Sequence, residues 1–155
     1  MSDSTTEILP SETLNELLTR AYDAEKGYEL AAESAENPAL KDFFHESCLQ
    51  RNKFGHTLKG FIADLDVEPD KGSSIEGKIH QAFMKIKAAL VDQDDLALVE
   101  ECRRGEETAM LDYKAALENP NLRTDARAAL EKQGADVLHQ LDALESIEAA
   151  LEISS

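Results

Sequence analysis

Apolar side chains recur every three or four residues along four long stretches of the chain, which is the spacing of one face of an α-helix. The stretches cover residues 11–36, 38–66, 94–118 and 121–151. On the first, the predicted inward face carries Leu14, Leu17, Leu18, Ala21, Glu25, Tyr28, Ala32 and Ala35. On the third, it carries Val99, Cys102, Glu106, Met110, Tyr113 and Leu117. The pattern predicts an all-α protein built on four long helices.

Two short breaks, "ENPAL" and "ENPNL", separate the first helix from the second and the third from the fourth. The residue before a proline avoids helical geometry, whereas the proline itself suits a first helical turn. Breaks this short make the flanking helices antiparallel neighbours, so we expect two helical hairpins. Thr13 and Glu16 have the spacing of a capping box at the start of the first helix.

The connection between the hairpins, about residues 67–93, is much longer. It contains the loop sequence "DVEPDKGSS", a second capping box from Ser73 to Glu76, and a shorter amphipathic helix with Ile75, Ile79 and Phe83 on one side. Such a connection can carry the chain back along the whole bundle. Two hairpins joined by one long crossover form a ferritin-like four-helix bundle. We expect residues 11–152 to form this single domain after a flexible N-terminal segment, residues 1–10.

Composition and charge narrow the functional classes. The 155 residues allow one domain with a proper core, and the formal net charge of -16 repels phosphate backbones and anionic lipid headgroups. We therefore expect neither nucleic-acid nor membrane binding. The chain shows no signal-peptide pattern and no run of about 20 apolar residues, which predicts a cytoplasmic protein. Cys48 and Cys102 do not form a Cys-x-x-Cys pair and are expected to pack as small hydrophobic side chains.

Each long helix places one conspicuous polar side chain on its inward face: Glu25, Arg51, Glu106 and Gln133. In the crossover topology all four fall at a similar depth, to within about one or two helical turns. The hydroxyl groups of Tyr28 and Tyr113 are available nearby. The sequence therefore predicts a buried polar layer made of these six residues.

Three segments carry a family resemblance: "YDAEKGYELAA" on the first helix, "RNKF" on the second and "GEETAMLDY" on the third. With the order of the helices, they resemble a bacterial four-helix-bundle family that is related to ferritin-like proteins and known as a domain of unknown function. The resemblance covers about residues 12–150. It implies the bundle fold and no established activity.

Ferritin-like di-iron proteins take a Glu from each of two helices and a Glu-x-x-His motif from each of the other two. Glu25 and Glu106 match the first pair. At the second pair of positions this chain has Arg51-x-x-Phe54 and Gln133-x-x-Asp136. A guanidinium group repels a metal cation and instead binds carboxylates in a forked geometry.

Three interpretations of the polar layer follow. The first and favoured one is a buried Glu25–Arg51–Glu106 network with Gln133 beside it, since buried charges must be paired. The second is a weakened iron or manganese site on Glu25 and Glu106, and the third is a small-ligand pocket. The helical positions of His45, His56 and His139 point away from the apolar faces, so they offer no further core ligands. No Ser or Cys has an inward His nearby, so nucleophilic catalysis is not supported.

The sequence therefore favours a protein without a cofactor and without catalytic activity. We expect a cytoplasmic ferritin-like bundle with a degenerate di-metal site that acts as an interaction or stress-associated protein. A homodimer could form through Leu30, Leu49 and Leu111, which face away from the main apolar stripes. The alternative is a metal-binding oxidase or storage protein that uses iron or manganese on Glu25 and Glu106.

Overall fold

The computed structural model describes residues 8–67, 69 and 94–154, and within them it contains four α-helices and no β-strand. They are α1 (Pro10–Ser34), α2 (Pro38–Ala63), α4 (Asp95–Leu117) and α5 (Thr124–Ser154). The prediction of four long helices is confirmed. The predicted shorter helix with Ile75, Ile79 and Phe83, and its capping box, lie outside the described residues.

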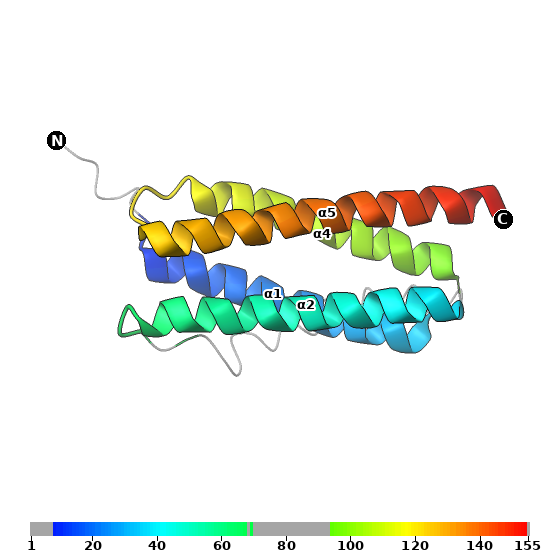
Figure 1. The fold of residues 1–155 in the computed structure, drawn as a ribbon, viewed down its shortest axis with the longest axis horizontal. Helices are drawn as coiled ribbons and strands as arrows, with labels where there is room; N and C mark the ends of the chain where they lie inside the picture. The colour runs from blue at the N-terminus through cyan, green and yellow to red at the C-terminus, as the bar shows by residue number, and fades with distance from the viewer. Residues whose placement is uncertain (1–7, 68, 70–93, 155) are drawn as a thin grey trace.

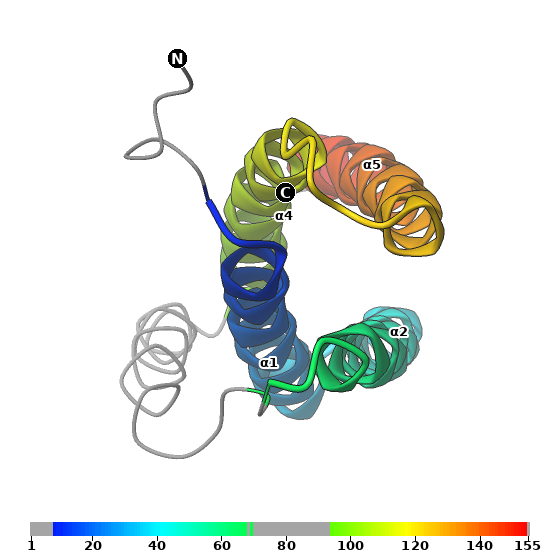
Figure 2. The same ribbon diagram turned by 90° about the vertical axis from the view of Figure 1, so that its left-hand side faces the viewer.

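The helices pair as two antiparallel hairpins, α1 with α2 and α4 with α5, and the hairpins pack with α1 beside α4 and α2 beside α5 (Figures 1 and 2). At one end of the bundle, the backbone N–H groups of Glu36 and Asn37 donate to the carboxylate of Asp95, at 2.9 and 3.0 Å. At the other end, Asp64 after α2 lies 3.9 Å from Arg123 before α5. Helices α2 and α4 therefore run in the same direction, and the chain between them joins opposite ends of the bundle.

The two asparagine–proline loops differ in what their asparagine side chains do. Asn37 is the N-cap of α2: its side-chain oxygen accepts from the N–H groups of Ala39 and Leu40, with Pro38 in the first turn. Asn119, by contrast, is buried and donates to the carbonyl of Ile8 and to Oγ1 of Thr13, at 3.0 and 3.1 Å. The second loop therefore anchors the start of α1, and α5 begins only at Thr124, three residues later than predicted.

The predicted capping box at the start of α1 is wrong. Helix α1 begins at Pro10 after Leu9, which makes no side-chain cap, so Thr13 lies inside the helix. Its hydroxyl is instead the acceptor for Asn119, and it is buried by the α4–α5 loop. The Thr13 hydroxyl, which the local sequence assigned to capping the helix, therefore binds Asn119 from a distant part of the chain.

The apolar core consists of two clusters separated along the bundle axis. The first cluster includes Leu14, Leu17, Leu18, Ala21, Phe54, Leu58, Ile62, Tyr113, Ala116, Leu130 and Val137. The second includes Tyr28, Ala31, Ala35, Leu40, Phe44, Leu98, Val99, Cys102 and Leu144. Between them, each of α2, α4 and α5 places polar side chains inward. None of the described helices combines the length and apolar character that crossing a membrane requires.

Surface positions were predicted with mixed success. His45, His56 and His139 are exposed, as predicted. Met110, predicted to face inward, is 37% exposed, because the buried face of α4 runs through Glu106, Ala109 and Tyr113 instead.

The apolar surface predicted for dimerisation is not continuous. Leu49 and Leu111 are exposed, but Leu30 packs against the second core cluster and is wrong as a surface residue. The helices α2 and α4 that carry Leu49 and Leu111 lie diagonally across the bundle, with no close backbone contact between their described residues (Figure 2). The two exposed leucines therefore belong to separate faces.

Candidate functional site

A buried ion pair lies between the two core clusters. Arg51 of α2 and Glu106 of α4 are 3% and 2% exposed, and Nη2 of Arg51 donates to Oε1 of Glu106. The two residues come from diagonally opposed helices, so the pair crosses the centre of the bundle. Removing two charges from water is costly unless each is hydrogen-bonded, and here each charge neutralises the other.

Tyr28 of α1 completes the coordination of Glu106. Its hydroxyl group donates to the second carboxylate oxygen, Oε2. The same hydroxyl accepts a hydrogen bond from Nε2 of Gln140, at 3.1 Å, and Nε2 also donates to Oγ of Ser47, at 2.6 Å. The hydroxyl of Ser47 donates in turn to the backbone carbonyl of Phe43, at 2.8 Å. All four helices therefore contribute to one connected network.

A second, shorter chain of hydrogen bonds lies beside the first apolar cluster. The hydroxyl of Tyr113 donates to Oε1 of Gln133 at 2.6 Å, and Nε2 of Gln133 donates to the carbonyl of Phe54 at 3.4 Å. Gln133 and Tyr113 are both buried. Five of the six predicted members of the polar layer, Tyr28, Arg51, Glu106, Tyr113 and Gln133, are thus buried side chains with partners, but they form two groups.

Glu25 is the sixth, and its predicted place in the layer is wrong. It is only partly buried, and its carboxylate accepts from Nδ2 of Asn52 on the exposed side of α1 and α2, at 3.1 Å. The core holds one guanidinium group at this level, and Glu106 and Tyr28 surround it. If Glu25 were buried as well, its carboxylate would have no cation of its own. In its partly exposed position the Glu25 carboxylate stays hydrated.

Burial and neighbouring charges shift the pKa values of Arg51 and the two buried tyrosines. Burial alone would lower the pKa of Arg51, but the Glu106 carboxylate more than compensates, and the pKa is raised. Burial raises the pKa of Tyr28 well above its usual value, and the adjacent Glu106 raises it further. Burial also raises the pKa of Tyr113, against the opposing effect of Arg51. Both phenols are therefore neutral hydrogen-bond donors at neutral pH.

The guanidinium group of Arg51 also packs between aromatic rings. Its Cζ atom lies 4.9 Å from the ring centroid of Phe54 and 6.0 Å from that of Tyr28, distances at which cation–π attraction operates. Its Nε atom is buried without a hydrogen-bond partner among the described residues. Arg51 is therefore held by one carboxylate and two ring faces, and one of its donors is unused.

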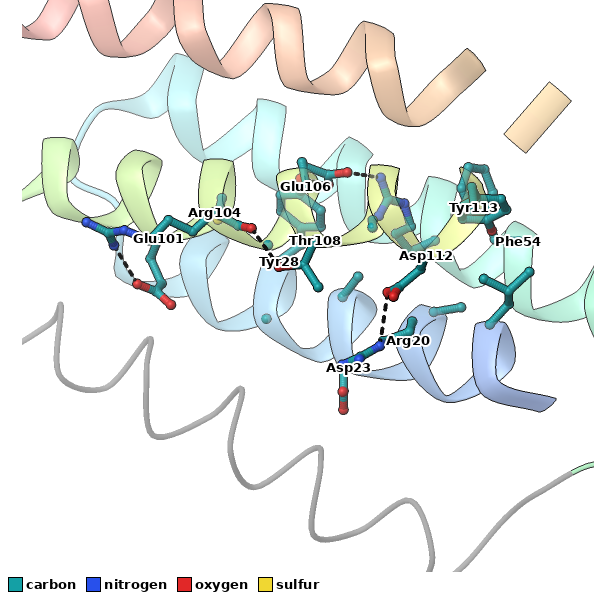
Figure 3. A pocket seen from close by; sticks show the side chains of 18 residues that line it. Arg20, Asp23, Tyr28, Phe54, Glu101, Arg104, Glu106, Thr108, Asp112 and Tyr113 are labelled. Carbon is teal, nitrogen blue, oxygen red and sulfur yellow. Dashed lines mark hydrogen bonds and ion pairs between the residues drawn. The ribbon is translucent and has the colours of Figure 1, made fainter. Parts of the chain in front are cut away.

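A cleft of about 440 Å³ opens between α1 and α4 and extends inward to this network (Figure 3). We call it the α1–α4 cleft. Small residues line part of both helical walls: Ala21, Ala24 and Gly27 on α1, and Gly105, Thr108 and Ala109 on α4. Helix α2 contributes Arg51 and Phe54. The ion pair between Arg20 and Asp112, at 3.0 Å, links the two helices beside the cleft (Figure 3).

The donor set does not fit the iron or manganese site considered as the alternative. Both carboxylate oxygens of Glu106 accept hydrogen bonds, and Arg51 places a positive charge beside them. Glu25 does not face Glu106, so the two carboxylates do not make a pair. Within the part of the chain that the structure describes, no cluster of three or more His, Cys, Asp or Glu side chains could hold a metal ion.

Sequence reasoning missed Gln140, which joins Tyr28 to Ser47 in the network. Leu141 was assigned to the inward face instead, and both residues are buried. A spacing of seven from Gln133 would have found Gln140, because helices in four-helix bundles follow a seven-residue repeat. The cleft had no signal beyond a run of small residues, which is equally typical of close helix packing.

A comparison with known proteins matches residues 10–119 to the model of a family described as "Domain of unknown function (DUF2383)". The match covers more than half of the 155 residues, and includes Arg51, Glu106, Tyr28 and the whole α1–α4 cleft but not Gln133 or Gln140. No curated protein and no solved structure matches the chain. The chain therefore belongs to the DUF2383 family of domains of unknown function.

Proposed function

We propose that the protein is a non-catalytic, cytoplasmic helical bundle of ferritin-like topology, in which an Arg–Glu–Tyr network occupies the centre where related bundles hold metal. It acts through contacts with other molecules, as an interaction or stress-associated protein. The observation that carries the proposal is the buried pair of Arg51 and Glu106, with Tyr28 donating to the second carboxylate oxygen.

The order of the helices supports the ferritin-like topology. Two short-loop hairpins are connected so that α2 and α4 run in the same direction, and each helix packs against its hairpin partner and one helix of the other hairpin. In ferritin-like bundles this order comes from one long crossover between the hairpins. A simple up-down-up-down bundle would make consecutive helices antiparallel throughout.

The network also explains why a core so polar need not be a reaction centre. The Glu106 oxygens and the Tyr28 hydroxyl already have partners inside the bundle. A catalytic acid or base must exchange its proton with a substrate, and a permanently charged guanidinium cannot do so. The geometry therefore favours a structural role for the polar layer, in which its hydrogen bonds determine how the four helices pack.

Metal content tests the proposal against the oxidase or storage alternative. Protein purified without chelators should contain far less than one iron or manganese per chain, because Arg51 occupies and repels the cation position. Elemental analysis of the parent and of Glu106→Ala measures this, and Arg51→Met/Glu106→Gln replaces Glu106→Ala if that variant does not fold. Stoichiometric metal in the parent that is lost on replacing Glu106 would overturn the proposal.

The proposal includes a homodimer, and its strongest support is the exposed apolar side chain of Leu111, which is 64% exposed. Light scattering should give twice the chain mass of 17.1 kDa. Leu111→Lys should restore the single-chain mass, since a charge at a buried apolar contact is costly. A mass of 17.1 kDa for the parent protein ends the homodimer proposal and leaves a different protein as the partner.

A further inference from the structure

The α1–α4 cleft has the size of a small-molecule site. Its volume of about 440 Å³ falls in the range of roughly 300–1,000 Å³ that is typical of ligand pockets. It is open because small side chains face each other on α1 and α4. Apart from the neighbouring backbone of its own helix, nothing lies within 4 Å of the place where a Cβ would stand on Gly27 or Gly105, so neither glycine is required for close helix contact.

The inner wall of the cleft offers mainly apolar surface, and Arg51 adds a buried Nε that has no hydrogen-bond partner among the described residues. Each oxygen of the Glu106 carboxylate already accepts a hydrogen bond, one from Arg51 and one from Tyr28, and the hydroxyl of Tyr113 donates to Gln133. What remains for a ligand is the ring surface of Phe54 and the two tyrosines, alkyl groups such as Leu17 and Ala109, and the single Nε–H donor of Arg51. Aromatic and aliphatic molecules gain most from such a wall.

Four charged residues at the outer edge of the cleft form two ion pairs. Arg20 binds Asp112 at 3.0 Å, and Arg104 binds Glu101 at 2.8 Å (Figure 3). A charged ligand group would have to compete with these pairs, and an anion would also be repelled by the formal net charge of -16. The charge pattern therefore selects against anions.

We propose that the α1–α4 cleft binds a neutral, largely apolar small molecule the size of two or three aromatic rings. The ligand lies between α1 and α4 with its inner end against Phe54 and the tyrosine rings. The ion pairs at the outer edge stay formed. Binding involves no chemical step, and the buried network acts as the rigid inner wall of the site.

The neutral fluorescent probe N-phenyl-1-naphthylamine tests this proposal on the full chain. We expect its fluorescence to rise and saturate at one probe per chain, with a dissociation constant on the order of 1–100 µM for a molecule of this size. The chain has no Trp, so the signal comes from the probe. The 8-sulfonate of the same ring system, 8-anilinonaphthalene-1-sulfonate, should bind at least tenfold more weakly, because it differs by one negative charge.

A cleft-filling variant locates the probe. Gly27→Leu/Gly105→Leu puts alkyl groups into the open space and should weaken binding of the neutral probe at least tenfold. Gly60→Leu is the matched control: it lies inside α2, away from the cleft, and a Cβ there also meets no atom within 4 Å. It should bind like the parent, and circular dichroism should show unchanged helix content in both variants. If the double variant does not fold, either single substitution serves.

Three results would each overturn the proposal. They are an absence of saturable binding, equal affinity for the probe and its sulfonate, and equal affinity of the parent and the cleft-filling variant. The metal and light-scattering measurements do not depend on the cleft. Failure here is therefore distinguishable from failure of the proposed function.

Discussion

Replacing Arg51 with Met should lower the free energy of unfolding by about 3–5 kcal/mol, because it leaves the Glu106 carboxylate buried without a cation. Met fills a similar volume, so the loss comes from the stranded charge more than from a cavity. Urea unfolding followed by circular dichroism at neutral pH measures the change. Few single substitutions in a domain of this size have a larger effect.

The structure also predicts which second substitution rescues this variant. Arg51→Met/Glu106→Gln should recover at least half of the lost stability, since the amide carries no charge and can still accept from the Tyr28 hydroxyl. Adding Glu25→Gln instead should recover nothing, because Glu25 is bound to Asn52 outside the layer. Rescue by Glu25→Gln would restore the three-membered network that the sequence predicted.

Arg20→Met is the matched control for the first substitution. Arg20 is also ion-paired, with Asp112 at 3.0 Å, but its side chain is 46% exposed. Exposed pairs contribute about 0–1 kcal/mol, so this variant should lose no more than that. If Arg51→Met cost as little as Arg20→Met, the buried network would not stabilise the bundle.

The difference between the predicted and observed cores follows from the helix repeat. Along α1 and its C-cap, the residues Leu14, Ala21, Tyr28 and Ala35, spaced by seven, are all buried. A seven-residue seam departs from a straight helix by about 20° per repeat. A projection at 100° per residue therefore placed Glu25 nearer the centre of the seam than the bundle does, and it placed Met110 of α4 inward when Ala109 lies there.

Local sequence could predict the helices, the proline-marked loops and the presence of Arg51, Glu106 and Gln133 in the core. It also predicted the pairing of Arg51 with Glu106, which is confirmed, but not the other partners of these residues. Glu106 was expected to share Arg51 with Glu25, but its second oxygen accepts from Tyr28, whose hydroxyl also accepts from Gln140 of α5. Partner choice depends on which side chains meet at one level of the bundle, and a rotation of tens of degrees is enough to exchange them.

The α1–α4 cleft is harder to predict from the sequence than the buried network. Alanine and glycine at helical spacing usually allow two helices to approach closely. Here the ion pair between Arg20 and Asp112 and the larger Tyr28 and Tyr113 border a region where the small residues leave space. Whether small residues create contact or a cavity is decided by the larger side chains around them.

Alkaline pH should destabilise the protein strongly through three buried groups. Burial raises the pKa of Tyr28, Tyr113 and Cys102 above their usual values, and all three bind their protons more tightly in the folded state. Their contribution to the free energy of unfolding is fully present below their pKa values in the unfolded chain, about 8.5 for Cys and 10 for Tyr. It is lost as the pH rises toward their pKa values in the folded chain. Each group then costs about 1.4 kcal/mol per pH unit.

Together the three groups should remove about 6 kcal/mol between pH 8 and pH 11, measured by urea unfolding across that range. Tyr113→Phe provides the internal reference, because it deletes one titrating group. At neutral pH it should be about 1–2 kcal/mol less stable than the parent, since Oε1 of Gln133 loses its donor. Above pH 10 the stability of the variant should fall by about 1.4 kcal/mol per pH unit less than that of the parent, because one titrating group is missing. The stability curves of the two proteins should therefore converge near pH 11. Parallel curves over pH 9–11 would mean that the Tyr113 phenol loses its proton as readily in the folded chain as in the unfolded one, and that the buried chain from Tyr113 to Gln133 is open to water.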